Sequence, residues 1–250
     1  MRWRKDATMD EAVPLGEMAA TSPVRRIAVV IGGGGIGGAL AEVLRSTASY
    51  DEVVVLGRRS EPALDLLDEA SIAACAGWLA ARGEPELVID ATGILHGPGM
   101  GPEKSWRELD PATLAQAFAI NAIGPALLMK HFLPLLPRAR RAVFATLSAK
   151  VGSIGDNRLG GWYAYRASKA ALNQLVRTAS IELRRSRPQA ICVALHPGTV
   201  DTGLSAPFAK SGLQVQPPEL AAKRLLTVLA GLTVEDSGGF FDYRGDRLPW

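Results

Sequence analysis

Cysteine is scarce in this sequence of 250 residues, because Cys75 and Cys192 are the only two and they stand far apart. Two isolated thiols give neither a disulfide framework nor the close spacing of metal ligands, so we predict no metal site. Charge of one sign is missing as well, since 28 basic residues balance 25 acidic ones, and aromatic residues make up 6%. Without a basic stripe interleaved with aromatic residues, a nucleic-acid-binding surface is not expected.

Long apolar runs are also missing. No unbroken run approaches the ~20 residues that cross a membrane, and the first residues lack an apolar stretch followed by a cleavage site. We therefore expect a cytoplasmic protein without a membrane segment.

Residues 1–25 are mixed in charge and aperiodic and contain Pro14 and Pro23, which predicts a disordered extension. A short helix over residues 10–20 is the alternative.

From Ile27 onward, short apolar runs alternate with segments of helical pattern. Continuous apolar strands are typical of a parallel sheet that is covered on both faces. The pattern predicts one α/β domain over residues 26–250, a doubly wound parallel sheet of about seven strands with helices on both faces. Strands are expected at 27–31, 53–56, 63–67, 87–90, 142–147, 190–195 and 239–242, and helices after the first strand and at about 69–81, 111–134, 163–185 and 218–232.

A glycine-rich loop joins the first expected strand to the first expected helix. From Gly32 to Gly38 every residue except Ile36 is glycine. Glycine lets the backbone turn sharply and approach a pyrophosphate, whose charge is stabilised by free amides and the helix dipole. A tight turn without a ligand would need fewer glycines, so the loop predicts a Rossmann-type dinucleotide site. Two registers remain open: Gly32, Gly34 and Gly37, or Gly32, Gly35 and Gly38.

The residues after the second expected strand predict which nicotinamide cofactor is used. An acid at this place binds the ribose hydroxyls of NADH, whereas a base binds the additional phosphate of NADPH. The sequence here is Gly57-Arg58-Arg59-Ser60. Two guanidinium groups and no acid favour NADPH. The alternative is a pair of exposed arginines that bind nothing.

Tyr165 and Lys169 are four residues apart in an expected helix, so they share one helix face about one turn apart. A phenol has an unperturbed pKa near ~10 and is a poor acid at neutral pH, and a neighbouring ammonium stabilises its phenolate. Such a pair can exchange a proton with an oxygen whose carbon gains or loses hydride. The spacing alone is common by chance, so its weight comes from the other motifs.

With these motifs, the sequence resembles the short-chain dehydrogenase/reductase superfamily from about Arg25 to Trp250. More narrowly it is similar to the C-factor (C-signal) group, close to the sniffer-type carbonyl reductases. The stretches that carry the resemblance are Pro102-Glu103-Lys104-Ser105, Asn121-Ala122-Ile123-Gly124-Pro125, 148–154, 156–166, His196-Pro197-Gly198-Thr199-Val200-Asp201-Thr202 and Pro249-Trp250.

The resemblance implies a role for each matching residue. Tyr165 would be the catalytic acid/base, and Lys169 would hold the nicotinamide ribose and lower the phenol pKa. Asn121 would keep a water in a proton relay, and Ser148 would hydrogen-bond the substrate oxygen. Asp65, in the short third strand, would contact the adenine amino group. The implied cofactor-binding residues are Gly32, Gly34, Gly35, Ile36, Gly37, Arg58, Arg59, Asp65, Ala91, Thr92, Gly93, Asn121, Tyr165, Lys169, Pro197, Gly198, Val200 and Thr202, with Thr199 beside them.

Three features depart from the superfamily pattern. The usual Asn-Asn-Ala-Gly after the fourth strand is Asp90-Ala91-Thr92-Gly93, so an acid at the strand end could replace one amide's hydrogen bonds. The catalytic serine commonly follows another serine, but Ala149 holds the second position. We therefore choose Ser148, with Ser153 as the alternative. Finally, few residues separate Arg59 from Asp65, which leaves no room for the usual helix and predicts a shallow adenine side.

Together these features predict an NADPH-dependent reductase of carbonyl compounds. The alternatives are a signalling protein that works through partner contacts, and an NADPH-sensing regulator. The short segment from Gly203 to Gln216 predicts an open pocket. The resemblance also implies a homodimer or homotetramer formed through the long helices, with Met129 and Phe132 facing the partner or else covering the sheet. Pro249 and Trp250 could pack at a subunit contact or over the pocket.

Overall fold

The computed structural model describes residues 25–205 and 215–250, so most of the expected N-terminal extension and residues 206–214 of the expected open segment lie outside it. Its centre is a parallel sheet of six strands in the order β2-β1-β3-β4-β5-β8. The strands are β1 (Ile27–Ile31), β2 (Glu52–Leu56), β3 (Pro85–Asp90), β4 (Ala142–Leu147), β5 (Ala190–His196) and β8 (Phe240–Asp242). A separate parallel pair joins β6 (Thr199–Val200) to β7 (Val215–Gln216).

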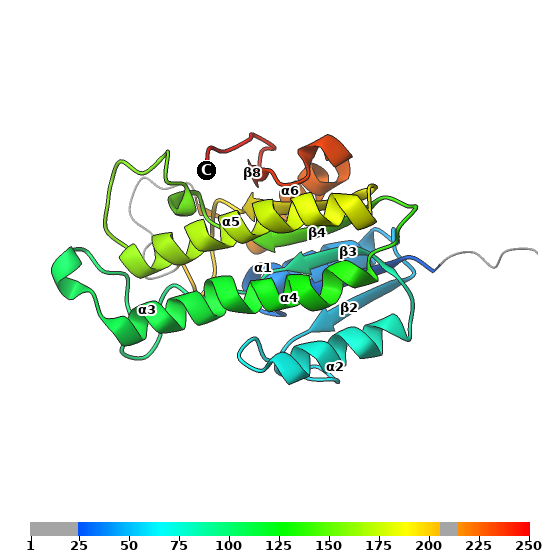
Figure 1. Cartoon of the computed structure of the whole chain (residues 1–250), viewed down its shortest axis with the longest axis horizontal. Helices are drawn as coiled ribbons and strands as arrows, with labels where there is room; N and C mark the ends of the chain where they lie inside the picture. Colours follow the sequence, from blue (N-terminus) through cyan, green and yellow to red (C-terminus); the bar gives the residue numbers. More distant parts are fainter. Residues whose placement is uncertain (1–24, 206–214) are drawn as a thin grey trace, which may run out of the picture.

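Helices cover both faces of the sheet (Figure 1). They are α1 (Gly35–Ser46), α2 (Glu69–Ala80), α3 (Pro111–Phe118), α4 (Gly124–Phe132), α5 (Tyr163–Ser186) and α6 (Pro218–Gly231), with 3-10 turns at Trp106–Glu108, Leu133–Leu135, Lys150–Gly152 and Val234–Asp236. Side chains alternate along each strand. In β1, Ile27, Val29 and Ile31 therefore join the core beneath α2, α4 and α5, while Ala28 and Val30 join the core beneath α1 and α6.

The expected doubly wound sheet is thus confirmed, with one correction. Residues 63–67 do not form a strand but belong to the loop from Gly57 to Asp68. Local bonds hold this loop: the Leu64 amide donates to Gly57 O at 2.9 Å, and the Leu67 amide donates to the Asp65 carboxylate at 3.0 Å. An Asp side chain that bonds the backbone two residues on competes with strand pairing. Among the described residues, β2 is consequently the edge strand.

The expected long helix after Pro111 is present, and it contains a π turn. α3 leads into the π turn Ala119–Ile123, which leads into α4 and a last 3-10 turn. The whole helical stretch from Pro111 to Leu135 is long and apolar enough to cross a membrane by length and composition, although no unbroken apolar run of that length marks it in the sequence. A core helix passes the same test, and Leu128 and Phe132 are fully buried here against the sheet.

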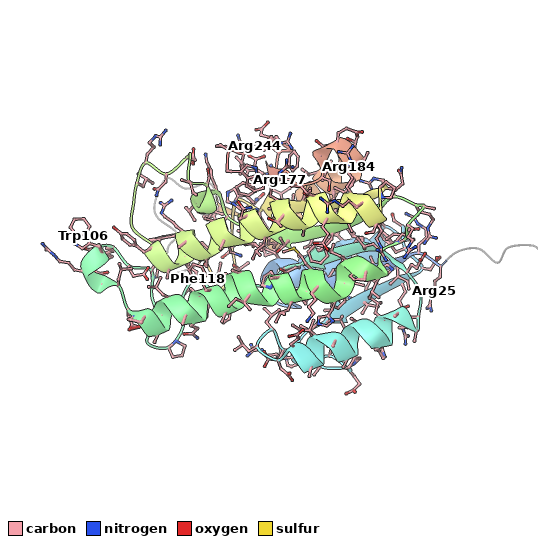
Figure 2. All side chains as sticks on the ribbon, viewed as in Figure 1. Arg25, Trp106, Phe118, Arg177, Arg184 and Arg244 are labelled. Carbon is pink, nitrogen blue, oxygen red and sulfur yellow. The ribbon has the colours of Figure 1, made fainter. Side chains whose placement is uncertain are left out.

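A contact with a partner subunit would require Met129 and Phe132 to face outward, and they do not. They are 4% and 0% exposed inside the chain's own core, so they cover the sheet. The apolar side chains that stay exposed on the long helical segments are Ile123 and Ile181, at 54% and 50%. Trp106 is also exposed, and it projects from the loop between β3 and α3 at the far end of the molecule from Arg25 (Figure 2).

Candidate active site

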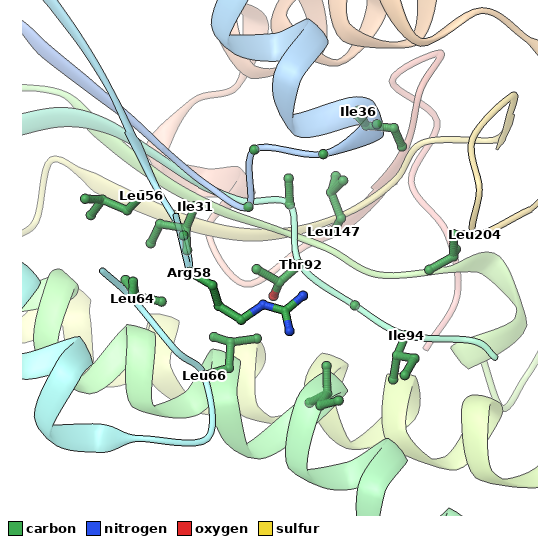
Figure 3. Close-up of a pocket in the computed structure, with 18 of the residues that line it drawn as sticks. Ile31, Ile36, Leu56, Arg58, Leu64, Leu66, Thr92, Ile94, Leu147 and Leu204 are labelled. Carbon is green, nitrogen blue, oxygen red and sulfur yellow. The ribbon is translucent and has the colours of Figure 1, made fainter. Parts of the chain in front are cut away.

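One pocket of about 1410 Å³ lies beyond the carboxyl ends of the strands. It runs without a break from the loop after β2 to the first turns of α5, and Figure 3 shows part of its wall. The chain order reverses beside β1, which has β2 on one side and β3 on the other. Ligands of open α/β sheets bind at such a switch point. The sequence-predicted residues in its wall are Gly32, Gly34, Gly35, Ile36, Arg58, Arg59, Asp65, Ala91, Thr92, Gly93, Ser148, Tyr165, Lys169, Pro197 and Thr202.

The glycine loop combines the two registers that the sequence left open. Gly32 and Gly35 have φ angles of +98° and +42°, which other residues rarely adopt. Gly37 is required for a different reason, because a Cβ there would lie 1.7 Å from Gly32 O. Gly34 precedes α1, and a Cβ on it would meet nothing within 4 Å. The loop therefore leaves open space at the start of α1.

The N-terminus of α1 is suited to an anion. Its N-cap, Gly34, has no side chain to cap the helix, and no acidic residue occupies the first turn. Free amides and the positive end of the helix dipole therefore face the pocket. Together with the open space at Gly34, this arrangement fits the pyrophosphate of a nicotinamide dinucleotide, as the sequence predicts.

The two arginines after β2 lie at one end of the pocket. Arg58 and Arg59 are both exposed and line its wall. The Arg58 guanidinium extends into the pocket between Leu66 and Thr92 (Figure 3). These groups could bind a phosphate, and Asp65 lines the same end from the loop rather than from a strand. The Asp65 carboxylate accepts a hydrogen bond from the Leu67 amide. The predicted contact between Asp65 and adenine stays a prediction.

Asp90 is the acid that stands at the end of β3 where the superfamily usually has an amide, and it makes structural hydrogen bonds there, as the sequence predicts. Its carboxylate is completely buried and accepts hydrogen bonds from the Thr92 amide at 3.0 Å, the Thr92 hydroxyl at 2.5 Å and the Thr146 hydroxyl at 2.6 Å. Burial raises the pKa of Asp90, while these bonds and the Lys169 charge oppose the rise. The acid thus ties the end of β3 to β4 and shapes the turn that carries Ala91 and Gly93.

Asn121 lies behind the pocket wall, inside the π turn. Its side chain accepts from the Ile94 amide at 2.8 Å and donates to Ile94 O at 2.8 Å and to the Ser168 hydroxyl at 3.1 Å. A Cβ on Gly93 would lie 3.3 Å from both Asn121 Oδ1 and Lys169 Nζ. Asn121 therefore fixes the strand-end loop against α5. Its predicted role in a proton relay stays a prediction.

Tyr165 and Lys169 both line the pocket, as the sequence predicts. Lys169 is 3% exposed, and its ammonium donates to Leu147 O at 2.7 Å. Burial lowers the pKa of Lys169 to about 8, with the charge of Asp90 opposing the fall. Burial raises the pKa of Tyr165 to about 12. The expected lowering of the phenol pKa by Lys169 is thus not found, because burial of the phenol raises its pKa.

Ser148 rather than Ser153 lines the pocket. The Ser148 side chain is on the α5 face of the sheet, where its hydroxyl donates to Asn173 Oδ1 at 2.7 Å. Ser153 is 1% exposed, and its hydroxyl accepts from the Asp156 amide at 3.1 Å. Between these two alternatives, the structure favours Ser148, because it shares the pocket wall with Tyr165.

The loop after β5 lines the pocket with a different set of residues from the predicted one, because Gly203 and Leu204 join Pro197 and Thr202 there. Pro197 and Thr202 line the pocket, whereas Val200 is buried in β6. A Cβ on Gly198 would lie 2.8 Å from Gln216 Nε2 and from the Tyr243 ring, so this glycine packs away from the pocket. Gln216 also donates to Pro197 O at 2.6 Å. Neighbours outside the predicted set therefore hold this loop.

Two further residues organise the start of α5. Glu103, only 4% exposed, accepts the Ala164 amide at 3.1 Å and caps a helix whose N-cap residue, Trp162, supplies no capping hydrogen bond from its side chain. Arg166 donates to Val151 O, Gly160 O and Gly161 O. Both lie in stretches that carry the family resemblance. Neither role could be predicted from the sequence. Spacing within one segment does not reveal a helix cap whose side chain is 61 residues away in the chain.

The pocket can therefore accommodate a dinucleotide that reaches from the basic end to the half-buried phenol of Tyr165 and the buried amine of Lys169. Among the described residues, no group of three or more His, Cys, Asp or Glu side chains could hold a metal ion. Comparison with known proteins agrees with this chemistry. Residues 26–211 match the family model described as short chain dehydrogenase.

Curated relatives include proteins of two kinds. The chain is 40% identical over 144 residues to C-signal of Myxococcus xanthus, which covers 57% of this chain and 82% of that protein. It is 32% identical over 199 residues to 1-hydroxy-2-glutathionyl-2-methyl-3-butene dehydrogenase of Rhodococcus sp. (strain AD45). This alignment covers 80% of this chain and 84% of that protein.

Solved structures with the same fold include carbonyl reductases. An NADPH-bound carbonyl reductase from chicken fatty liver superposes with a TM-score of 0.78 at 27% identity, covering 91% of this chain and 99% of that one. A carbonyl reductase from Pseudomonas aeruginosa PAO1 gives 0.72 at 27% identity, covering 90% and 100%. Carbonyl reductase Sniffer of D. melanogaster shows the fold at 0.78 and 22% identity, covering 91% and 100%.

Proposed function

We propose that this chain, which belongs to the short-chain dehydrogenase family, reduces carbonyl compounds with NADPH. Membership makes it an oxidoreductase. The observation that carries the finer proposal is the single pocket that joins Arg58 and Arg59 at one end to Tyr165 and Lys169 at the other. Such a pocket matches a cofactor with a phosphate at one end and a reactive ring at the other.

NADPH rather than NADH is supported by the basic end of the pocket. Two exposed guanidinium groups follow β2, where the sequence Gly57-Arg58-Arg59-Ser60 contains no acid. Arginine binds phosphate by charge-assisted hydrogen bonds in a planar fork. Two structural neighbours were solved with this cofactor, the chicken fatty liver enzyme with NADPH and a short-chain dehydrogenase/reductase from Burkholderia multivorans with NADP.

Bound NADPH supplies the hydride, and the chain supplies the proton and the geometry. With its pKa raised to about 12, Tyr165 is protonated at neutral pH and can donate its proton to the oxygen of a carbonyl. Lys169, with a pKa of about 8, is mostly charged at neutral pH and can hold the cofactor's ribose. Ser148 lies in the same wall and can hydrogen-bond the substrate oxygen.

The test combines cofactor binding with turnover. Fluorescence titration should show tighter binding of NADPH than of NADH, and a panel of small and medium carbonyls should then include substrates. Tyr165→Phe should lower kcat by on the order of a hundredfold or more while NADPH still binds, because it removes only the proton donor. Tyr163→Phe is the matched control, since Tyr163 is on the same helix outside the pocket wall. A Tyr165→Phe protein with most of its activity would refute the proposal.

The rival function is signalling through partner contacts, and the 40% identity to C-signal favours it. A purely binding role makes no chemical demand on Tyr165, Lys169 and Ser148, which nevertheless share one pocket. NADPH binding without oxidation across the carbonyl panel would favour the rival, or an NADPH-sensing regulator. We also propose a cytoplasmic homodimer or homotetramer, and sedimentation that shows only monomer would exclude the assembly.

A further inference from the structure

The hydroxyl of Ser148 is already committed to a neighbour. It donates to Asn173 Oδ1 at 2.7 Å, and the two side chains are 4% and 3% exposed. A serine hydroxyl has one proton, so it cannot donate to Asn173 and to a carbonyl oxygen at the same time. The next residue is Ala149, which offers no second hydroxyl. As arranged, Ser148 can accept a hydrogen bond in the pocket but cannot give one.

Asn173 carries the group that could change this. Its Nδ2 is buried and has no hydrogen-bond partner among the described residues. Buried amide donors are rarely left unpaired in proteins. Asn173 is also four residues after Lys169 and eight after Tyr165, so the three side chains follow one face of α5.

We propose that Asn173 is a positioning residue that sets the direction of the Ser148 hydroxyl. Rotating the amide about its Cβ–Cγ bond exchanges Oδ1 and Nδ2. Nδ2 then donates to Ser148 Oγ, and the serine proton is released for the carbonyl oxygen beside Tyr165. Both arrangements keep one hydrogen bond between the residues, which makes the exchange inexpensive. This inference rests on the proposed carbonyl reduction and adds to it the residue that determines whether the Ser148 hydroxyl can donate.

Three single variants separate positioning from a structural role. Asn173→Asp has the same shape but, when ionised, only accepts, so it locks the serine proton away from the substrate. Asn173→Ala leaves Ser148 free to rotate, and Ser148→Ala removes the donor. We expect Ser148→Ala and Asn173→Asp each to lower kcat for carbonyl reduction by about a hundredfold, the effect of one lost oxyanion donor. Asn173→Ala should stay within about fivefold of wild type, with NADPH affinity unchanged in all three.

A structural role gives the opposite order. It makes Asn173→Ala the more damaging change, since that variant leaves a cavity in the core while Asp keeps the shape. This order, measured on variants whose thermal unfolding shows that they fold, would overturn the inference. An Asn173→Asp protein with wild-type kcat would do the same.

The double variant Ser148→Ala/Asn173→Asp tests whether Asn173 acts through the serine. We expect it to lose no more activity than Ser148→Ala alone, because the locked hydroxyl is already absent. A further loss would show that the new carboxylate acts on Lys169 instead, and the inference would fail. If the wild-type chain reduces no carbonyl at all, the proposed function fails with it. If the wild-type enzyme turns over normally and depends on Tyr165, any one of these three contrary results overturns the role of Asn173 alone.

Discussion

The two ends of the pocket are built in different ways. At the end beside β2, Arg58 and Arg59 are exposed on a loop that local turns hold. At the end beside α5, Lys169, Asp90 and Asn121 are between 0% and 3% exposed, and buried hydrogen bonds fix each of them. The exposed end suits selection among ligands, and the buried end suits holding reacting groups in place. Substitutions at the first should change affinity, and substitutions at the second should change rate.

The largest effect should come from removing the buried amine. We expect Lys169→Met to lower kcat/KM by on the order of 10²–10⁴-fold, because it removes the cation beside Tyr165 and leaves the Asp90 carboxylate buried without its positive neighbour. Steady-state kinetics with NADPH measures this. Lys130→Met, at an exposed ion pair with Glu69, is the control and should behave as wild type. Comparable kinetics for the two variants would contradict the division between the ends.

The opposite end should respond in affinity. Replacing both Arg58 and Arg59 by Ala should weaken NADPH binding by roughly 10- to 100-fold, about the value of one or two charge-assisted hydrogen bonds, and leave NADH binding unchanged. The ratio of the two dissociation constants, from fluorescence titration, is the measurement. Arg45→Ala is the control, since Arg45 is exposed at the other end of α1. Equal losses for both cofactors would mean that the arginines do not read the phosphate.

The pH dependence of kcat/KM should report the buried end of the pocket, through the titration of Lys169. Lys169 has a pKa of about 8, so it is charged below that pH and loses its proton above it. We expect kcat/KM to fall about tenfold per pH unit above about 8, because this parameter reports groups of the free enzyme. Tyr165, at about 12, ionises too late to cause this limb. Lys169→Arg keeps its charge and should remove the limb. A limb that persists in the variant would assign it to another group.

A smaller effect is expected from the cap on the catalytic helix. Glu103→Ala leaves the Ala164 amide unpaired at the start of α5 and should lower the free energy of unfolding by about 1–2 kcal/mol. We expect kcat to fall several-fold, since Tyr165 directly follows Ala164 in the first turn of α5, with NADPH affinity unchanged. Glu103→Gln keeps an acceptor oxygen and should recover most of both losses. Chemical denaturation and kinetics on the two variants provide the comparison, and equal losses would assign the effect to the charge.

The sequence predicted the buried end of the pocket better than the exposed end. Tyr165, Lys169 and Ser148 were found because a fixed helical spacing and an ordered set of motifs bring them together. The loop after β2 misled the prediction, because Ala63 to Leu67 is as apolar as a strand. Leu64 is buried from a turn instead, and Leu67 is 65% exposed. Local hydrogen bonds of Asp65 and Gly57 decide this conformation, and hydrophobic pattern does not report them.

Hydrogen bonds between side chains and residues of distant segments could not be predicted from the sequence either. Asn173, Glu103 and Gln216 each bond a residue between 19 and 61 positions away, and no periodicity connects such pairs. The glycine register was settled only by backbone angles at Gly32 and Gly35 and by the contact at Gly37. Motifs thus located the chemistry, while the tertiary structure determined which atoms are free to take part.

The position of β2 at the edge of the sheet has a consequence for solubility. An open edge presents backbone groups that can pair with a strand of another molecule and start aggregation. Here Glu52, the first residue of β2, forms ion pairs with Arg25 at 3.3 Å and Arg82 at 3.2 Å, which places charge along that border. Charged residues at a sheet edge discourage such pairing. Among the described residues, Glu52 and its two arginine partners therefore protect the β2 edge of the sheet.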